Sequence, residues 1–286
     1  MKAGSGAGTL TIVATPLGNA ADLSPRAAAA LREADVIVAE DTRSARQLLQ
    51  AGGIGQGPRI LSCFDANEGA RAAEVAALLA DGARVALISE AGTPLVSDPG
   101  YRIVAAAIAA GARVVPVPGP SALLAALVAA GLPTDSFLFL GFPPRKPGPR
   151  RRLFESVRAL PFTLVLYESP LRVGATLADL AAVLGDGRRA CLARELTKPH
   201  EEIVRDDLGA LAARYATQRP LGEVTLVIAG APASAAAEDD DDADLVARAR
   251  HLIAEGQSTR DVARALAEMT GRPRRDVYKL ITSARD

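Results

Sequence analysis

The chain repeats one order of patterns: a short apolar run, a loop rich in glycine and proline, then a stretch with helical periodicity. In the first half the apolar runs are continuous rather than alternating, which is typical of strands covered on both faces. Such repeats predict a parallel sheet with helices on both sides, an α/β domain. The expected strands are residues 9–14, 36–39, 59–63, 83–88 and 113–117. The expected helices are 24–34, 68–82 and 102–110, and residues 118–131 form a Gly-Pro loop that leads into a further helix.

The longest of the connecting loops, residues 89–101, reads SEAGTPLVSDPGY and follows the apolar run ARVALI. About thirteen residues is long for a connection between a strand and a helix. Ligands of open α/β sheets bind outside the carboxyl ends of the strands, where this loop lies. Gly92 and Gly100 let the backbone approach a ligand closely, and Asp98 adds a carboxylate. We interpret the loop as part of a binding site, with an ordinary connection as the alternative.

A second block of apolar runs begins near residue 132 and predicts a mixed α/β domain. Its expected strands are 137–142, 163–167, 190–194, 202–205 and 223–229, with a helix over 169–185 that Ser169 caps. Residues 195–204 turn tightly between two strands, so part of this sheet should be antiparallel. We divide the chain into an N-terminal α/β domain (1–131), a second α/β domain (132–231), an acidic linker (232–243) and a C-terminal helical domain (244–286).

The C-terminal block shows three helical patterns, over residues 244–255, 258–268 and 273–284. Ser258 followed by Asp261 resembles a capping box. Residues 244–286 hold nine Lys or Arg and six Asp or Glu, a net charge of +3. A small helical domain of this kind suits nucleic-acid binding. It suits dimerisation or docking equally well.

Composition excludes several classes of protein. The whole chain carries 33 basic and 33 acidic residues, so any nucleic-acid signal must be local. The two cysteines form no CxxC motif, which argues against a disulfide framework or a cysteine zinc site. The start of the chain does not read as a signal peptide, and no apolar stretch is long enough for a membrane span, so we expect a soluble cytoplasmic protein. With only two histidines we expect no histidine metal site.

Charged residues follow two strands of the first block. Glu40, Asp41 and Arg43 come at the end of the strand 36–39, where they would orient a hydroxyl group and bind a phosphate. A helix cap with a salt bridge is the alternative. Asn67 and Glu68 stand at the start of the helix 68–82, where a solvated first turn is the alternative.

The second block has charged groups of its own. Glu168 ends a strand, and residues 193–201 contain five charged or titratable side chains, Lys198 among them; surface charge is the alternative. Residues 145–152, RKPGPRRR, predict a flexible basic loop that suits a phosphate backbone, with a solvated connector as the alternative.

The chain offers no obvious catalytic nucleophile, because it has no G-x-S-x-G motif and little histidine. It also lacks GxGxxG and P-loop motifs. Loops of small residues and scattered carboxylates suit catalysis by positioning, on a substrate that brings its own reactivity. A sulfonium methyl donor is one such reagent. These features alone do not identify S-adenosylmethionine.

Seven ordered segments carry a resemblance to a known family: TLTIVATPLGNAADLSPRA, VIVAEDTR, SEAGTPLVSDPGY, VVPVPGPSALLAAL, TLVLYESPLRV, ARELTKPHEE and GEVTLVIAG. The chain resembles the bacterial ribosomal RNA small-subunit methyltransferase I family of the tetrapyrrole-methylase-like superfamily. The resemblance covers nearly all of residues 9–230, and the terminal helices resemble that family's accessory domain.

The resemblance implies two unlike α/β domains with a cofactor cleft between them, distinct from Rossmann-type methyltransferases, plus the small helical domain. It implies S-adenosylmethionine as the cofactor and methylation of a ribose 2′-hydroxyl on a decoding-centre cytidine of 16S rRNA, within the small ribosomal subunit. It also implies a homodimer in the cytoplasm. Two alternatives stay open: a methylase of tetrapyrroles or other small molecules, and a non-catalytic nucleic-acid-binding protein.

Our hypothesis for the mechanism assigns roles to individual residues. We expect Asp41 or Glu68 to accept the proton with Asn67 nearby, and Arg43 with Lys198 to hold flanking phosphates. Related sequences usually have a histidine near the Asn67–Glu68 pair, and this chain has none there, which argues against an imidazole role. The implied cofactor-binding residues are Pro16, Leu17, Gly18, Ala91, Gly92, Thr93, Val96, Ser121, Ala122, Glu168 and Leu196.

Overall fold

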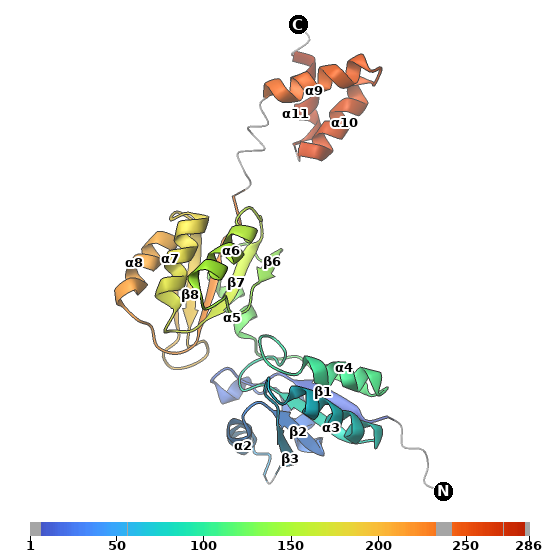
Figure 1. Ribbon diagram of the computed structural model, residues 1–286, viewed down its shortest axis with the longest axis vertical. Helices are drawn as coiled ribbons and strands as arrows, with labels where there is room; N and C mark the ends of the chain where they lie inside the picture. Colours follow the sequence, from blue (N-terminus) through green and yellow to red (C-terminus); the bar gives the residue numbers. More distant parts are fainter. Residues whose placement is uncertain (1–6, 56, 233–241, 271, 284–286) are drawn as a thin grey trace. The chain divides into compact units, whose positions relative to one another are not determined.

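The computed structural model describes residues 7–55, 57–232, 242–270 and 272–283 (Figure 1). The chain divides into two compact units, Met1–Arg158 with Phe162–Ala229, and Ala159–Pro161 with Gly230–Asp286. The first unit contains two five-stranded sheets, and the second contains the terminal helices. Most of the expected acidic linker, residues 233–241, lies outside the described residues.

The first sheet is parallel throughout, in the order β3-β2-β4-β1-β5, as the continuous apolar runs predict. Alternate strand residues pack on opposite faces: Leu10 and Leu87 face the cluster with α3 and α4, and Val13 and Ile37 face the cluster with α1 and α2. The elements are β1 (Thr9–Val13), α1 (Pro25–Glu33), β2 (Val36–Ala39), α2 (Thr42–Ala51), β3 (Arg59–Ser62), α3 (Glu68–Ala80), β4 (Arg84–Ile88), α4 (Tyr101–Ala109) and β5 (Arg113–Val117), with a 3-10 turn, η1 (Ala20–Asp22).

The second sheet is mixed, in the order β6-β7-β10-β8-β9. Only β6 and β7 run parallel, and β8 and β9 form the antiparallel pair that the tight turn predicts. The elements are α5 (Ala122–Ala130), β6 (Phe137–Phe139), α6 (Pro147–Val157), β7 (Thr163–Glu168), α7 (Val173–Leu184), β8 (Arg189–Arg194), β9 (Glu202–Asp207), α8 (Leu208–Thr217) and β10 (Val224–Ile228).

Helix α5 connects the two sheets. It follows β5, yet its buried face, Ala126, Leu127 and Ala130, packs against Val165 and Val227 of the second sheet. Ser121 caps its start, because the serine hydroxyl accepts a hydrogen bond from the Leu124 amide. The loops after β1, β4 and β5 therefore lie beside the second sheet.

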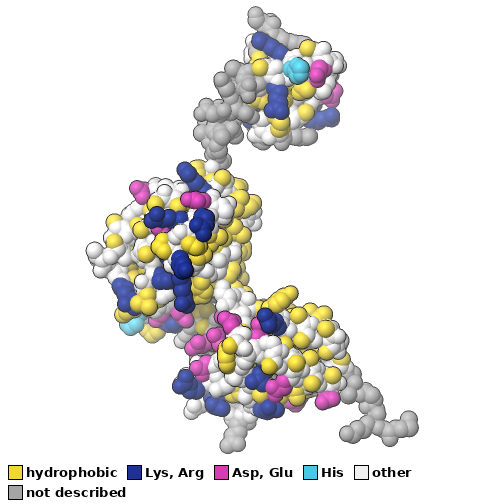
Figure 2. Space-filling model, viewed as in Figure 1, with side chains coloured by type: hydrophobic (Ala, Val, Ile, Leu, Met, Phe, Trp, Pro, Cys, Tyr) yellow, Lys and Arg dark blue, Asp and Glu magenta, His cyan; other side chains and the backbone are white. Residues whose placement is uncertain are grey.

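The expected flexible basic loop at 145–152 is wrong, because most of it belongs to α6. Pro147 stands at the first helical turn, where proline is tolerated. Arg150 is buried, and its guanidinium donates to Asp179 of α7 at 2.7 Å; Arg151 donates to the other oxygen of the same carboxylate. Four basic side chains of the run stay exposed, Arg145, Lys146, Arg151 and Arg152. Lys and Arg side chains are spread over this helical face in Figure 2.

Two further expectations need correction. The helix expected over 169–185 begins four residues later, at Val173, because residues 169–172 form a turn in which Ser169 accepts from the Leu171 amide. Helices α2, α6 and α8 were not predicted from the sequence.

The second unit is a three-helix cluster of α9 (Asp242–Ala254), α10 (Thr259–Thr270) and α11 (Arg274–Ser283), as the sequence predicts. Leu245, Leu266, Val277 and Ile281 lie in its core. The capping box forms: the Ser258 hydroxyl accepts from the Asp261 amide and donates to its carboxylate. Among the described residues, no helix is both long and apolar enough to cross a membrane.

Candidate functional site

Three loops at the carboxyl ends of neighbouring strands are joined to one another. Thr15, after β1, and Gly92, after β4, exchange backbone hydrogen bonds of 2.8 and 3.0 Å. Thr93 then donates its hydroxyl to the carbonyl of Pro120, in the loop after β5. Gly92 has a φ of +88°, and an added Cβ would lie 3.1 Å from the Leu17 side chain. The loops thus form one compact wall of backbone and small side chains.

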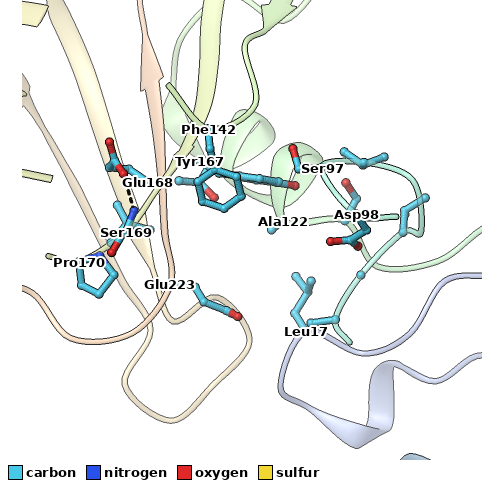
Figure 3. A pocket seen from close by; sticks show the side chains of 17 residues that line it. Leu17, Ser97, Asp98, Ala122, Phe142, Tyr167, Glu168, Ser169, Pro170 and Glu223 are labelled. Carbon is cyan, nitrogen blue, oxygen red and sulfur yellow. Dashed lines mark hydrogen bonds between the residues drawn. The ribbon is translucent and has the colours of Figure 1, made fainter. Parts of the chain in front are cut away.

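This wall forms one side of a pocket, and the second sheet forms the other (Figure 3). Phe142 and Tyr167 pack with ring centres 5.6 Å apart. The Tyr167 hydroxyl accepts from the Leu123 amide at the start of α5, which fixes the ring across the two sides. The lining residues are Leu17, Ala91, Gly92, Thr93, Val96, Ser97, Asp98, Ser121, Ala122, Phe142, Tyr167, Glu168, Ser169, Pro170, Glu223, Val224 and Thr225.

Most of the expected cofactor residues lie on this pocket. Eight of them line it: Leu17, Ala91, Gly92, Thr93, Val96, Ser121, Ala122 and Glu168. Pro16, Gly18 and Leu196 are not lining residues, but Leu196 shares a buried cluster with Leu17. Gly18 lies against Lys198, where an added Cβ would be 2.2 Å from the lysine Cγ.

The charged residues that line the pocket are all acidic: Asp98, Glu168 and Glu223. Two of them have cationic partners. Glu168 is buried, forms an ion pair with Arg172 at 2.5 Å and accepts from the Thr176 hydroxyl at 2.6 Å. Glu223 lies 3.2 Å from the Lys198 ammonium.

Asp98 differs from the other two because it forms no ion pair with any described residue. Burial, followed by repulsion from Glu40, raises its pKa to about 6; repulsion from Glu90 and Glu223 acts in the same direction, and a hydrogen bond with Ser89 opposes it. A partly buried carboxylate that titrates near neutral pH can hold or release a proton under ordinary conditions.

Backbone strain is concentrated beside the pocket. Among the described residues, four non-glycine residues have positive φ: Leu95, Ser97, Glu195 and Thr197, with values between 49° and 71°. Leu95 and Ser97 flank Val96, and Ser97 directly precedes Asp98. The second pair stands in the β8–β9 turn on either side of Leu196. Residues in this region of φ are uncommon and gather at functional sites.

Asp41 and Arg43 form a helix cap with a salt bridge, which was the alternative to a binding role. The Asp41 carboxylate caps α2, accepting from the amides of Arg43 and Ser44, and these hydrogen bonds lower its pKa. The Arg43 guanidinium lies 3.5 Å from Asp41, and its side chain is 85% exposed. Neither residue lines the pocket.

Asn67 and Glu68 hold loops in place. Asn67 accepts from the Phe64 amide and donates to the Ser62 carbonyl. The Glu68 carboxylate accepts from the amides of Gly100 and Arg102, so it fastens the start of α3 to the end of the long loop and the start of α4. Lys198 lies between two carboxylates, 3.0 Å from Glu195 and 3.2 Å from Glu223.

Sequence reasoning missed Phe142, Tyr167 and Glu223. Phe142 and Tyr167 end apolar runs of the second block, and Glu223 begins one; these positions were the available signal. The described residues contain no cluster of three His, Cys, Asp or Glu side chains that could hold a metal ion.

The sequence of this chain matches a known family over residues 9–212, the tetrapyrrole (corrin/porphyrin) methylases. The chain belongs to this family. The solved structure of the methyltransferase CobJ covers 78% of this chain and 95% of its own, with a TM-score of 0.60. At 24% identity, that likeness shows the tetrapyrrole methylase fold alone.

Nearer relatives place this member of the family more narrowly. It is 44% identical to the ribosomal RNA small subunit methyltransferase I of Micromonospora olivasterospora, over 98% of this chain and 88% of that protein. It is also 44% identical to the protein of that name from a Synechocystis strain, over 96% and 97% of the two chains. The resemblance stated from the seven sequence segments is thus confirmed.

Proposed function

We propose that this protein methylates a ribose 2′-hydroxyl of a decoding-centre cytidine in 16S rRNA, with S-adenosylmethionine as the methyl donor. The observation that supports the donor is the pocket, whose charged lining residues are all acidic. Such a lining suits a cationic ligand and disfavours nucleotide phosphates. The names of the relatives support the RNA substrate, and the family resemblance supports the 2′-hydroxyl and the cytidine.

The residues present fit the donor. Gly92 leaves open a space that a Cβ would partly fill, and Leu17, Ala122 and Tyr167 offer apolar surface. We propose that these residues hold it with the rest of the expected set, and that Pro16, Gly18 and Leu196 support the set from outside the lining. When bound, S-adenosylmethionine supplies an electrophilic methyl group on a positively charged sulfur.

We propose Asp98 as the proton acceptor for the acceptor hydroxyl. As the methyl group passed to the 2′-oxygen, the donor's carbon–sulfur bond would break and leave its electron pair on a neutral thioether. The O–H bond would break as well, and the proton would pass to a carboxylate oxygen of Asp98 and then to solvent. Among the three acidic lining residues, only Asp98 is free of an ion pair with a described residue. Its pKa of about 6 leaves it mostly ionised at neutral pH and still basic enough to accept a proton.

Asp41 and Glu68 remain the alternative acceptors. Each carboxylate is already engaged by two backbone amides, Asp41 as the cap of α2 and Glu68 beside α4. We expect Asp41→Asn and Glu68→Gln to retain more turnover than Asp98→Asn. The reverse order would assign the proton to one of these two residues. We propose that exposed Arg43 contacts RNA phosphate. We propose that Asn67 and Lys198 hold their own loops in position, Asn67 after β3 and Lys198 between β8 and β9.

The direct test uses labelled S-adenosylmethionine with small ribosomal subunits from cells that lack the modification. After nuclease digestion, mass spectrometry should find one 2′-O-methylated cytidine of the decoding centre. Naked 16S rRNA in a parallel reaction tests whether the assembled subunit is the substrate. Label on a base instead of a ribose, or on a porphyrin-like acceptor only, would contradict the proposal.

We further propose that the protein works as a cytoplasmic homodimer. Helices α4 and α5 expose large apolar side chains, among them Tyr101 (75% exposed), Ile108 and Val128 (74% exposed). Aromatic residues such as Tyr101 are enriched at interfaces between subunits. Light scattering of the purified chain should give twice the mass of one chain, and a monomer at every concentration would contradict this.

A further inference from the structure

The three-helix unit carries a basic hollow that the methyl-transfer site does not use. Its lining residues come from the start of α10 and from α11: Arg260, Arg274, Arg275, Tyr278 and Lys279. All five side chains are exposed, and the Tyr278 ring is 45% exposed. The hollow therefore places four cationic groups around one exposed aromatic ring.

None of these four cations forms an ion pair with a described residue. Two other arginines of the unit are paired: Arg272 lies 2.7 Å from Asp242, and Arg264 lies 3.3 Å from Asp261. Like charges held together repel one another, and none of the lining residues of the hollow is acidic. Bound polyanion would relieve the repulsion.

We infer that this hollow binds the phosphate backbone of RNA, with Tyr278 available to stack on a base. The inference rests on the proposed function for the identity of the RNA. Three of the four cations are arginines, whose planar guanidinium groups bind phosphate through two parallel hydrogen bonds. Exposed aromatic rings interleaved with cations are the usual surface for single-stranded RNA.

RNA fits better than the other anionic partners. A helix that binds a membrane surface needs an apolar face beside its cations. Here the apolar faces of α10 and α11 are buried in the core of the unit, with Val262, Leu266, Val277 and Ile281 each 4% exposed or less. A second copy of the hollow would bring like charges together, so self-association through it is disfavoured.

The test compares two double variants of the full chain that each remove two positive charges. Arg274→Gln with Arg275→Gln removes two of the four cationic groups that line the hollow. Arg248→Gln with Arg264→Gln is the matched control, since both arginines are exposed elsewhere on the unit. Binding to small ribosomal subunits, and to a labelled single-stranded RNA of about 20 nucleotides, is measured over a salt series without cofactor.

We expect the hollow variant to bind RNA roughly tenfold more weakly at low salt. The slope of log affinity against log salt should become shallower by about 1.5, since each lost phosphate contact removes roughly 0.7–0.9. The control pair should change both quantities much less. In methylation assays the hollow variant should raise the KM for subunits and keep kcat.

Equal affinity and slope for the two double variants would overturn the inference. So would binding to vesicles of anionic lipid that depends on Arg274 and Arg275 while RNA binding does not. The outcomes separate this inference from the proposed function, because binding is measured without methyl transfer. A hollow-dependent salt slope without any methylated cytidine would refute the proposed reaction and leave the RNA site standing.

Discussion

The two sides of the pocket use the same kind of residue in opposite ways. On the second sheet, Glu168 is 2% exposed. Its carboxylate forms an ion pair with Arg172 and accepts hydrogen bonds from the Thr176 hydroxyl and the Ser169 amide. On the first sheet, Asp98 faces the same pocket without an ion pair and with a pKa raised to about 6. The comparison teaches that a carboxylate on a pocket wall is a structural residue when its partners are built in, and a candidate reactive group when they are not.

The largest expected effect comes from removing the reactive carboxylate. Asp98→Asn keeps the size of the side chain but cannot accept a proton. We expect kcat to fall roughly 10²–10⁴-fold, the usual contribution of a general base, with little change in cofactor affinity. Single-turnover methylation of small subunits measures the rate, and calorimetric titration of the cofactor measures the affinity.

The pH profile sharpens this prediction. The wild-type rate should rise with pH up to about 6 and then level off, because Asp98 must be ionised to accept the proton. The residual activity of the variant should lack that rise. If the variant matched the wild-type rate while binding the cofactor normally, Asp98 would be excluded as the base.

Removing the structural carboxylate should damage stability instead. Glu168→Ala leaves Arg172 and the buried Thr176 hydroxyl without their acceptor. Breaking a buried pair in this way costs about 3 kcal/mol of unfolding free energy. Urea unfolding monitored by circular dichroism measures the loss. Glu168→Gln is the matched control and should lose less, since its amide oxygen still accepts a hydrogen bond. Full stability in the alanine variant would contradict the contrast between the two sides.

Sequence patterns predicted the two sheets well because continuous apolar runs report burial directly. They failed where a charged run became structural. The letters RKPGPRRR indicate a solvated loop. Arg150 is nevertheless buried, because its guanidinium donates to Asp179 of α7, some thirty residues later in the chain. No local pattern contains that partner.

The same limit applies to the site. Seven of the eight expected cofactor residues on the pocket lie there because their loops follow parallel strands that end at one edge of the first sheet. The eighth, Glu168, ends β7 of the second sheet. The different roles of the Glu168, Asp41 and Asp98 carboxylates could not be predicted, because hydrogen bonds and burial in the folded chain decide which role each one takes. Asp41 and Asp98 both follow a strand, yet one caps a helix and the other faces the pocket.

A smaller effect should come from the wall itself. Gly92→Ala places a Cβ at a φ of +88° and 3.1 Å from Leu17. We expect a loss of about 1–2 kcal/mol in unfolding free energy and weaker cofactor binding, because the loop must shift at the pocket. Gly111→Ala is the matched control, since it has a φ of +71° and no atom within 4 Å of the added Cβ. Equal effects on cofactor affinity in the two variants would show that strain alone, and not the pocket wall, is responsible.

The smallest expected effect is a gain in thermal stability in Asp98→Asn, the variant that we expect to lose activity. Asp98 has a folded pKa of about 6 against an ordinary value of 3.8. Below pH 4 both folded and unfolded states hold the proton, so the group has no effect on stability. Between pH 4 and 6 the unfolded state ionises first, so stability falls as pH rises, and above pH 6 the full penalty applies. The penalty is at most about 3 kcal/mol, and solvent contact reduces it to about 1 kcal/mol.

Asp98→Asn removes this penalty, so we expect the variant to unfold at a higher temperature than the wild type at pH 8 and to differ little at pH 4.5. Thermal unfolding of both proteins across that range measures the difference, and Asp41→Asn serves as the control. The cap of α2 has a lowered pKa, so that variant should lose stability at pH 8, the opposite sign. A carboxylate retained at the expense of stability is what a functional role predicts. If both aspartate variants lost stability at pH 8, Asp98 would belong with Glu168 among the structural carboxylates.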